Sequence, residues 1–274
     1  MNFTERVKNV IDSKRSFVCV GLDPDIKLIP ESISGSDEER IFAFNKSLIE
    51  ATSEYASAYK LNSAFYEACG EQGYRALKRT IQIIPDDTIT ILDAKRADIG
   101  NSSAMYARAA FDILKAESMT VNPYMGYDSI EPFMLNEERG VFILCLTSNP
   151  GSDDLQKLVL DDSRLLFMET ARKIVEWNKR KNLGMVVGAT HPRELAQVRE
   201  IAPDIPLLLP GIGAQQGDLE QTVRNAIGRR RAPAFINSSR GIIYASSGED
   251  FAKAAGKNCQ KLRDSINAVI DNIE

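Results

Sequence analysis

The sequence predicts a (β/α)8 TIM barrel with an extra helix at its N-terminus. Three observations predict this fold. Eight short apolar runs alternate with amphipathic ones along the 274 residues, as strands and helices do in parallel α/β proteins. The short runs are rich in Val, Ile and Leu and show little polar alternation, which is typical of strands covered on both faces. Polar residues follow several of the runs, as expected at the carboxyl-terminal ends of barrel strands.

Each apolar run is short enough for one strand. In chain order the runs are FVCVGLD (17–23), YKLNSAF (59–65), TITILDAK (88–95), SMTVNPY (118–124), GVFILCLTS (140–148), GMVVGAT (184–190), IPLLLPG (205–211) and PAFINSS (233–239). Eight strands are the number that closes such a barrel. A doubly wound open sheet is the alternative, but it usually has a glycine-rich turn after its first strand. Here the first run ends in GLDPD instead.

Amphipathic segments lie between these runs. In two of them, apolar residues repeat at steps of three and four, as on one face of a helix. These residues are Ile41, Phe44, Leu48 and Tyr55, and near the end of the chain Leu262, Ile266 and Val269. Phe3, Val7 and Val10 have the same spacing before the first strand. They predict the extra N-terminal helix.

Size and composition are those of a soluble globular protein. An α/β barrel routinely reaches about 250 residues as one unit, so we expect residues 1–274 to form a single domain. A hydrophobic content of 43% with 26% charged residues is ordinary and supplies a large core. The formal net charge of −4 argues against a nucleic-acid or anionic-membrane binder, because such partners need a cationic field.

We expect a cytoplasmic location. The N-terminal stretch MNFTERVKNVIDSK is charged throughout and lacks the apolar region of a signal peptide. No apolar run approaches the roughly 18 residues of a membrane span. The four cysteines form no C-x-x-C pair. We therefore expect neither disulfides nor a zinc site.

The third strand ends in more charge than a buried strand should hold. Asp93 and Lys95 lie two apart in ILDAKRADIGNSS, so they project from the same face of a strand. Asp98 follows just beyond the strand end. We expect these three residues and Lys60 to alternate in one array of zero net charge, because pairing makes the burial of charges tolerable. A purely structural ion-pair network is the alternative, although such networks often stabilise no better than hydrophobic residues.

Two later segments have features of an anion site. PGIGAQQGD (210–218) places glycines just before a predicted helix, where backbone N–H groups can approach an anion. Barrels commonly bind phosphate with the loops after strands seven and eight. Arg240 in NSSRGI can add charge-assisted hydrogen bonds there. A plain tight turn is the alternative, and the neighbouring Gln215 together with Arg240 favours the anion site.

Five motifs at five predicted strand ends resemble the orotidine-5′-phosphate decarboxylase family. They are YKLN, the D-x-K-x-x-D of residues 93–98, LTSNPG, PGIGAQQGD and NSSRGI. They occur in the family's order over nearly the whole chain, and the length and the wording KLNSAFYEACG resemble its longer bacterial stand-alone subgroup. The resemblance implies conversion of orotidine 5′-monophosphate to uridine 5′-monophosphate (UMP) and carbon dioxide, the last step of de novo UMP synthesis. It implies no metal and no organic cofactor.

The resemblance also implies roles for the charged residues. Lys95 would donate a proton to C6 of the pyrimidine, and Asp93 would face the substrate carboxylate. Lys60 and Asp98 would complete the alternating array. Asp98 and Ser102 would reach into the neighbouring subunit's site, which implies a homodimer.

A set of substrate-binding residues follows from the same resemblance. In it, Asp23 holds ribose hydroxyls together with Lys60 and Asp98. Ser148 reads the pyrimidine edge, and Gln215 and Arg240 hold the phosphate. The full set is Asp23, Asn62, Ser102, Ser148, Gly213, Gln215, Arg240 and Gly241. Gln216 departs from the family, which more often has glycine there, and a positive φ at that position would favour glycine.

Three other functions are the alternatives to this one. A metal-dependent sugar-phosphate decarboxylase or aldolase with the same D-x-K-x-x-D framework would need further carboxylates, whereas YKLN supplies Lys60 and Asn62. A Schiff-base aldolase needs a neutral lysine, and the acids on both sides of Lys95 favour its charged form. A non-catalytic phosphate-binding barrel would not need Asp93, Lys95 and Asp98 together.

Overall fold

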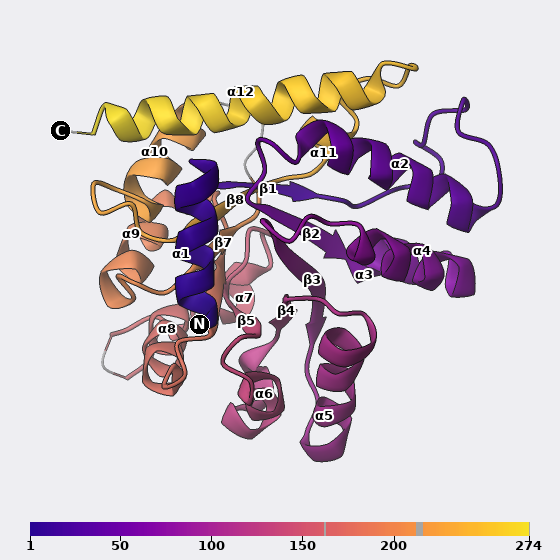
Figure 1. The fold of residues 1–274 in the computed structure, drawn as a ribbon. Helices are drawn as coiled ribbons and strands as arrows, with labels where there is room; N and C mark the ends of the chain where they lie inside the picture. Colours follow the sequence, from indigo (N-terminus) through magenta and orange to yellow (C-terminus); the bar gives the residue numbers. More distant parts are fainter. Residues whose placement is uncertain (162, 212–215, 274) are drawn as a thin grey trace.

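Eight parallel strands close into a TIM barrel in the order β1 to β8, with β1 hydrogen-bonded to β8 (Figure 1). The structure is a computed structural model that describes residues 1–161, 163–211 and 216–273. The strands are β1 (Val18–Gly21), β2 (Ala58–Asn62), β3 (Ile89–Arg96), β4 (Ser118–Val121), β5 (Gly140–Leu146), β6 (Leu183–Val187), β7 (Leu207–Leu209) and β8 (Ala234–Ser238). Each strand lies within one of the eight predicted runs or extends it by one residue. The predicted barrel is confirmed.

Helices cover the outside of the barrel. They are α1 (Phe3–Lys14), α2 (Asp37–Thr52), α3 (Ser63–Glu67), α4 (Gly70–Gln82), α5 (Gly100–Arg108), α6 (Tyr127–Met134), α7 (Ser152–Leu155), α8 (Leu166–Trp177), α9 (Pro192–Ile201), α10 (Gln216–Ala226), α11 (Arg240–Ile243) and α12 (Phe251–Asp271). A π-helical turn, η1 (Ala109–Ile113), continues α5, and a 3-10 turn, η2 (Pro123–Met125), precedes α6. The long α12 packs against α2 and α10. In the described part of the chain, no helix combines the length and apolar character that crossing a membrane requires.

The extra helix α1 covers the amino-terminal end of the barrel, in front of the strands in Figure 1. The backbone N–H of Phe3 donates to Glu137 O, just before β5, at 2.8 Å. The Phe3 ring packs edge-on against Phe142 of β5, with 5.9 Å between the ring centroids. Gly140 leaves room for that ring, because a Cβ there would lie 2.2 Å from Phe3. One end of the barrel is therefore closed by packing, which leaves the carboxyl-terminal end for chemistry.

Two local expectations were wrong. The run 59–65 is not all strand, because β2 ends at Asn62. The Asn62 side chain accepts the Ala64 N–H at 3.1 Å and caps α3, which satisfies a helix donor that would otherwise be free. Tyr55 does not belong to a helix face, since α2 ends at Thr52. Both errors are at element boundaries, where periodicity carries little information.

Candidate active site

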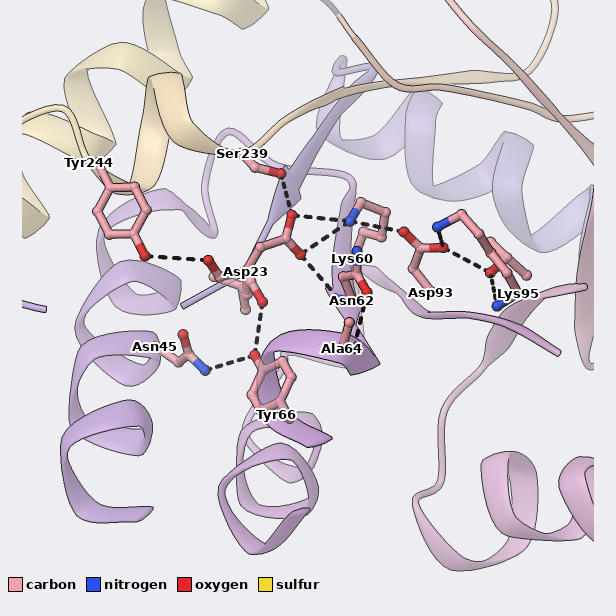
Figure 2. A network of polar contacts seen from close by, with 12 residues as sticks. Asp23, Asn45, Lys60, Asn62, Ala64, Tyr66, Asp93, Lys95, Ser239 and Tyr244 are labelled. Atoms are coloured by element: carbon pink, nitrogen blue, oxygen red, sulfur yellow. Dashed lines mark hydrogen bonds and ion pairs between the residues drawn. The ribbon is translucent and has the colours of Figure 1, made fainter. Parts of the chain in front are cut away.

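Four charged side chains form one row at the carboxyl-terminal ends of β1, β2 and β3 (Figure 2). Lys60 Nζ lies 3.2 Å from Asp23 Oδ1 and 3.3 Å from Asp23 Oδ2. On its other side it lies 3.3 Å from Asp93 Oδ2. Asp93 Oδ1 in turn accepts a hydrogen bond from Lys95 Nζ at 2.7 Å. The signs alternate along the row Asp23, Lys60, Asp93 and Lys95, and its net charge is zero. We call these four residues the charge array.

Pairing keeps the buried members of the charge array charged. The side chains of Lys60 and Asp93 are only 5% and 9% exposed. Burial lowers the pKa of Lys60, but attraction to Asp23 and Asp93 outweighs burial and raises this pKa above its usual value. Burial likewise raises the pKa of Asp93, while Lys60, Lys95 and two hydrogen bonds outweigh burial and lower it. Both groups are therefore ionised at neutral pH.

Lys95 stands at the open edge of the charge array. Its side chain is 46% exposed, against 9% for its partner Asp93. The backbone of Lys95 has φ +47°, a left-handed conformation that few residues other than glycine adopt. The pairing of β3 with β4 shifts register between Leu92 and Arg96. The predicted meeting of Asp93 and Lys95 is confirmed, but a bulge rather than regular strand alternation brings it about.

Thr120 of β4 contacts both residues of that pair. Its hydroxyl donates to Asp93 Oδ1 at 2.9 Å. The same oxygen accepts the backbone N–H of Lys95 at 2.9 Å. Thr120 is 1% exposed. Thr120 was not among the predicted residues, although its place in the fourth predicted run, SMTVNPY (118–124), could have indicated an inward-facing hydroxyl.

Asp23 is held from two sides. Ser239, the residue before α11, donates its hydroxyl to Asp23 Oδ2 at 2.7 Å. The backbone N–H of Asn62 donates to Asp23 Oδ1 at 3.1 Å. Gly21 makes room for this contact, because a Cβ there would lie 1.8 Å from Ser239 Oγ. Ser239 was not among the predicted residues either, even though it lies within the NSSRGI motif.

Asp98 is not a member of the charge array within one chain, contrary to the sequence expectation. It is half-buried, and its Oδ1 accepts the neighbouring N–H of Ile99 at 2.8 Å. Asp98 follows the bulge at Lys95 and leads into α5, so it leaves the line of the strand. The second carboxylate of the charge array is Asp23. Ser102 is exposed on α5.

Other predicted binding residues surround the same end of the barrel. Ser148 follows β5 and packs closely on Gly188, where a Cβ would lie 2.8 Å from Ser148 Cα. Arg240 and Gly241 begin α11 after β8, and both are exposed. Asn62 ends β2 beside Asp93 in register. Gly213 and Gln215 lie outside the described residues, and Gln216 is the first residue of α10.

The carboxylates of the site are arranged around ammonium groups rather than around one another. Within the described ranges, no three acid, histidine or cysteine side chains gather as they would to bind a metal ion. Asp23 and Asp93 are the acids that meet at the centre, and Lys60 Nζ lies between them. This arrangement suits a reaction that needs a positioned ammonium beside a carboxylate.

Comparison with known proteins gives one consistent result. The family model described as "Orotidine 5'-phosphate decarboxylase / HUMPS family" matches residues 16–255. An orotidine 5′-phosphate decarboxylase of Dehalococcoides mccartyi is 48% identical over 270 residues, covering 97% of this chain and 98% of that protein. One from a Roseiflexus species is 47% identical over 271 residues, covering 98% and 99%. The solved structure of Leishmania donovani OMP decarboxylase matches with a TM-score of 0.85 and 38% identity, covering 99% of both chains.

Proposed function

The chain belongs to the orotidine 5′-phosphate decarboxylase family and converts orotidine 5′-monophosphate to UMP and carbon dioxide, and we propose that Lys95 protonates C6 in this reaction. The protein is therefore a carboxy-lyase of UMP biosynthesis. The observation that carries the proposal is the position of Lys95, whose ammonium lies 2.7 Å from the buried Asp93 at the open edge of the charge array. A substrate entering from the carboxyl-terminal ends of the strands meets this ammonium group.

The reaction needs such a group because of the charge that develops on carbon. As the C6–carboxyl bond breaks, its electron pair stays on C6, and carbon dioxide leaves. A proton then passes from Lys95 Nζ to C6, which completes UMP and leaves a neutral amine to be reprotonated from solvent. The carbanion is poorly delocalised in the ring. Catalysis must therefore lower the barrier by about 20 kcal/mol, near the top of the usual range.

Magnitudes indicate which member of the charge array contributes most. Repulsion between Asp93 and a substrate carboxylate about 4 Å away amounts to about 4 kcal/mol at an effective dielectric constant near 20. This is too little to be the main effect. The larger share comes from a fixed ammonium that stabilises charge as it appears on C6. Lys60 supports this role because it neutralises Asp93 from the other side, and Asp23 in turn pairs with Lys60 and holds it there.

The remaining residues bind the nucleotide. Asp23 holds ribose hydroxyls, Ser148 reads the pyrimidine edge, and Arg240 with Gln215 binds the phosphate. The proposal is supported by the described members, which lie after β1, β5 and β8 at the same end of the barrel. Binding energy from the phosphate, which lies away from the reacting carbon, can keep the site assembled through the chemical step.

We also propose that the active enzyme is a homodimer in which Asp98 and Ser102 complete the partner's site. Exposed apolar side chains near these residues support it. They are Ile99 (56% exposed), Met105 (56%), Tyr106 (40%), Tyr124 (78%) and Met125 (44%). α5 packs on α6 through Ser103, whose hydroxyl donates to Ser129 O at 2.8 Å. Such a concentration of exposed apolar groups is typical of an interaction surface.

We further propose that residues 1–274 act as one catalytic domain in the cytoplasm. The four cysteines are free, as is usual in a reducing compartment. Burial raises the pKa of Cys145 to about 12. Burial also raises the pKa of Cys259 to about 12, although Arg263 lowers it slightly. These thiols therefore stay protonated and unreactive at neutral pH.

Substitution of Lys95 tests the proposed chemistry. The loss of absorbance that accompanies decarboxylation is followed with chelator present, which separates this reaction from a metal-dependent one. We expect Lys95→Ala to abolish turnover while UMP still binds, because the phosphate and ribose contacts remain. Lys173→Ala is the control, since that lysine is exposed on α8 and pairs only with Glu176 among the ion pairs described. Near-normal turnover of the Lys95 variant would refute the proposal.

A further inference from the structure

We propose that Thr120 is a positioning residue for Lys95, and that its hydroxyl fixes both the main chain and the ammonium of that lysine. The inference rests on the proposed role of Lys95 as proton donor. It concerns a side chain of β4, a strand to which the resemblance assigns no residue of the site. Thr120 itself does not need to touch the substrate.

Three hydrogen bonds close a ring through these residues. The Lys95 backbone N–H donates to Thr120 Oγ1 at 2.9 Å. The Thr120 hydroxyl donates to Asp93 Oδ1 at 2.9 Å. The same Asp93 oxygen accepts from Lys95 Nζ at 2.7 Å. The two ends of Lys95 are thus tied to one another through Thr120 and Asp93.

Lys95 needs such a constraint more than a residue in a regular strand would. Its backbone is left-handed, with φ +47°, and a conformation of this kind persists only when its surroundings enforce it. The lysine side chain is long and carries about 2 kcal/mol of rotamer entropy. It is also 46% exposed, so core packing restrains it little. Hydrogen bonds to a rigid partner can supply the restraint that packing does not give to Lys95.

Thr120 is suited to be that partner. It lies in β4, which pairs on both sides with β3 and β5. Its side chain is buried, with 1% exposure of the residue, and a β-branched side chain has few accessible rotamers. The hydroxyl can donate one bond and accept another at the same time. The position of Lys95 is therefore tied to the barrel wall.

Replacing the Thr120 hydroxyl should change the position of Lys95 without changing the charges of the charge array. Thr120→Val keeps the shape of the side chain but leaves the Lys95 N–H without this acceptor and Asp93 without this donor. Asp93 keeps its contacts with Lys60 and Lys95, so the charge array stays ionised. No described hydrogen bond of Thr120 reaches Ser148 or Arg240. The variant should therefore lose turnover and keep nucleotide binding.

Kinetics of three variants test the proposal. We expect Thr120→Val to lower kcat by about ten- to a hundredfold, because misplacing a catalytic group by about 1 Å can cost about a hundredfold. KM and the inhibition constant of UMP should change less than about threefold, because the substitution affects the chemical step and leaves the contacts that bind the nucleotide in place. Thr120→Ser keeps the hydroxyl and should stay within about threefold of the wild-type kcat. Ser118→Ala is the matched control, as it removes a buried hydroxyl of β4 that donates to Thr90 O at 3.0 Å.

The outcomes distinguish this inference from the proposed chemistry. Wild-type kcat in Thr120→Val, with Lys95→Ala inactive, would overturn the positioning role and leave the proton-donor role standing. Full activity of Lys95→Ala would overturn both. Equal losses in Thr120→Ser and Thr120→Val would assign the effect to packing and also overturn the inference. If Thr120→Val does not fold, the pair Thr120→Ser and Thr120→Ala, which differs by one oxygen atom, carries the same comparison.

Discussion

Lys60 connects the two halves of the charge array. It is the most buried charged side chain of the array, and it contacts Asp23 on one side and Asp93 on the other. Removing one partner of a buried ion pair leaves an uncompensated charge and costs about 3–5 kcal/mol. The array therefore acts as a unit. The second, deeper pair therefore adds rigidity to the ammonium of Lys95 and the carboxylate of Asp93.

The ionisation of Asp93 should appear in the stability of the protein at low pH. An aspartate in the unfolded chain has a pKa of about 3.9. In the folded protein, burial raises the pKa of Asp93, but contacts with Lys60 and Lys95 outweigh burial and lower this pKa below the unfolded value. A depressed carboxyl pKa contributes stability that is fully present above the unfolded pKa and is lost as the pH falls through the folded pKa. The loss from this residue therefore begins below about pH 4.

Denaturant unfolding between about pH 5 and pH 2 checks this expectation. The slope of unfolding free energy against pH should be shallower in Asp93→Asn than in the wild type below about pH 4, because the variant has no carboxyl to titrate. Asp271→Asn, at the exposed end of α12, is the control and should keep the wild-type slope. An unchanged slope in Asp93→Asn would mean that this carboxylate is not held as described.

At the scale of elements, the two ends of the barrel differ. The amino-terminal end is closed by the packing of α1, and the carboxyl-terminal end holds the charge array. Phe3 of α1 fills the amino-terminal end beside Gly140 and Phe142. The charge array occupies the opposite end of the strands. Overpacking at the amino-terminal end should therefore affect stability and leave catalysis unchanged.

Gly140→Ala tests this division. The new methyl group would lie 2.2 Å from Phe3, so we expect the unfolding free energy to fall by about 1–3 kcal/mol. Turnover per folded molecule should stay at the wild-type value. In a Phe3→Ala background the same substitution should cost much less, because the clashing ring is gone. Equal costs in both backgrounds would contradict the packing of Phe3 against Gly140.

The predicted elements largely match the structure because their period depends on local sequence. Pro192 begins α9, as expected for a proline at a first helical position. The buried face of α12 is less well predicted. Cys259 and Ile270 are buried, whereas Leu262 is only partly buried. Which side of a helix meets the barrel depends on its neighbours as well as on its own pattern.

At the scale of the whole molecule, the proposed homodimer can be tested by mixing two inactive proteins. A heterodimer of Lys95→Ala and Asp98→Ala chains has one site with both wild-type residues and one site with neither. After random exchange of subunits, about a quarter of all sites should regain activity. Sedimentation should give twice the chain mass of 30.4 kDa.

Two results would contradict this assembly. The mixture could stay as inactive as its components, although subunit exchange is demonstrated with a tagged chain. Alternatively, Asp98→Ala alone could keep wild-type turnover. A matched control mixes Lys95→Ala with Asp93→Asn. Because Asp93 and Lys95 come from the same chain, that heterodimer has no intact site and should not recover activity.

The barrel and its extra helix could be predicted from the sequence alone, because apolar runs, spacing along a helix and motif order are local properties of a chain. The pair of Asp93 and Lys95 could be predicted as well, although a bulge rather than strand alternation brings the two side chains together. The fourth member of the charge array could not. Asp23 reaches Lys60 because β1 and β2 pair with Gly21 beside Lys60, and the register between strands is a property of the closed barrel. Thr120 and the left-handed backbone of Lys95 belong to the same class of facts. They arise where two strands lose their regular pairing, and such a shift depends on contacts between segments that lie far apart in the chain.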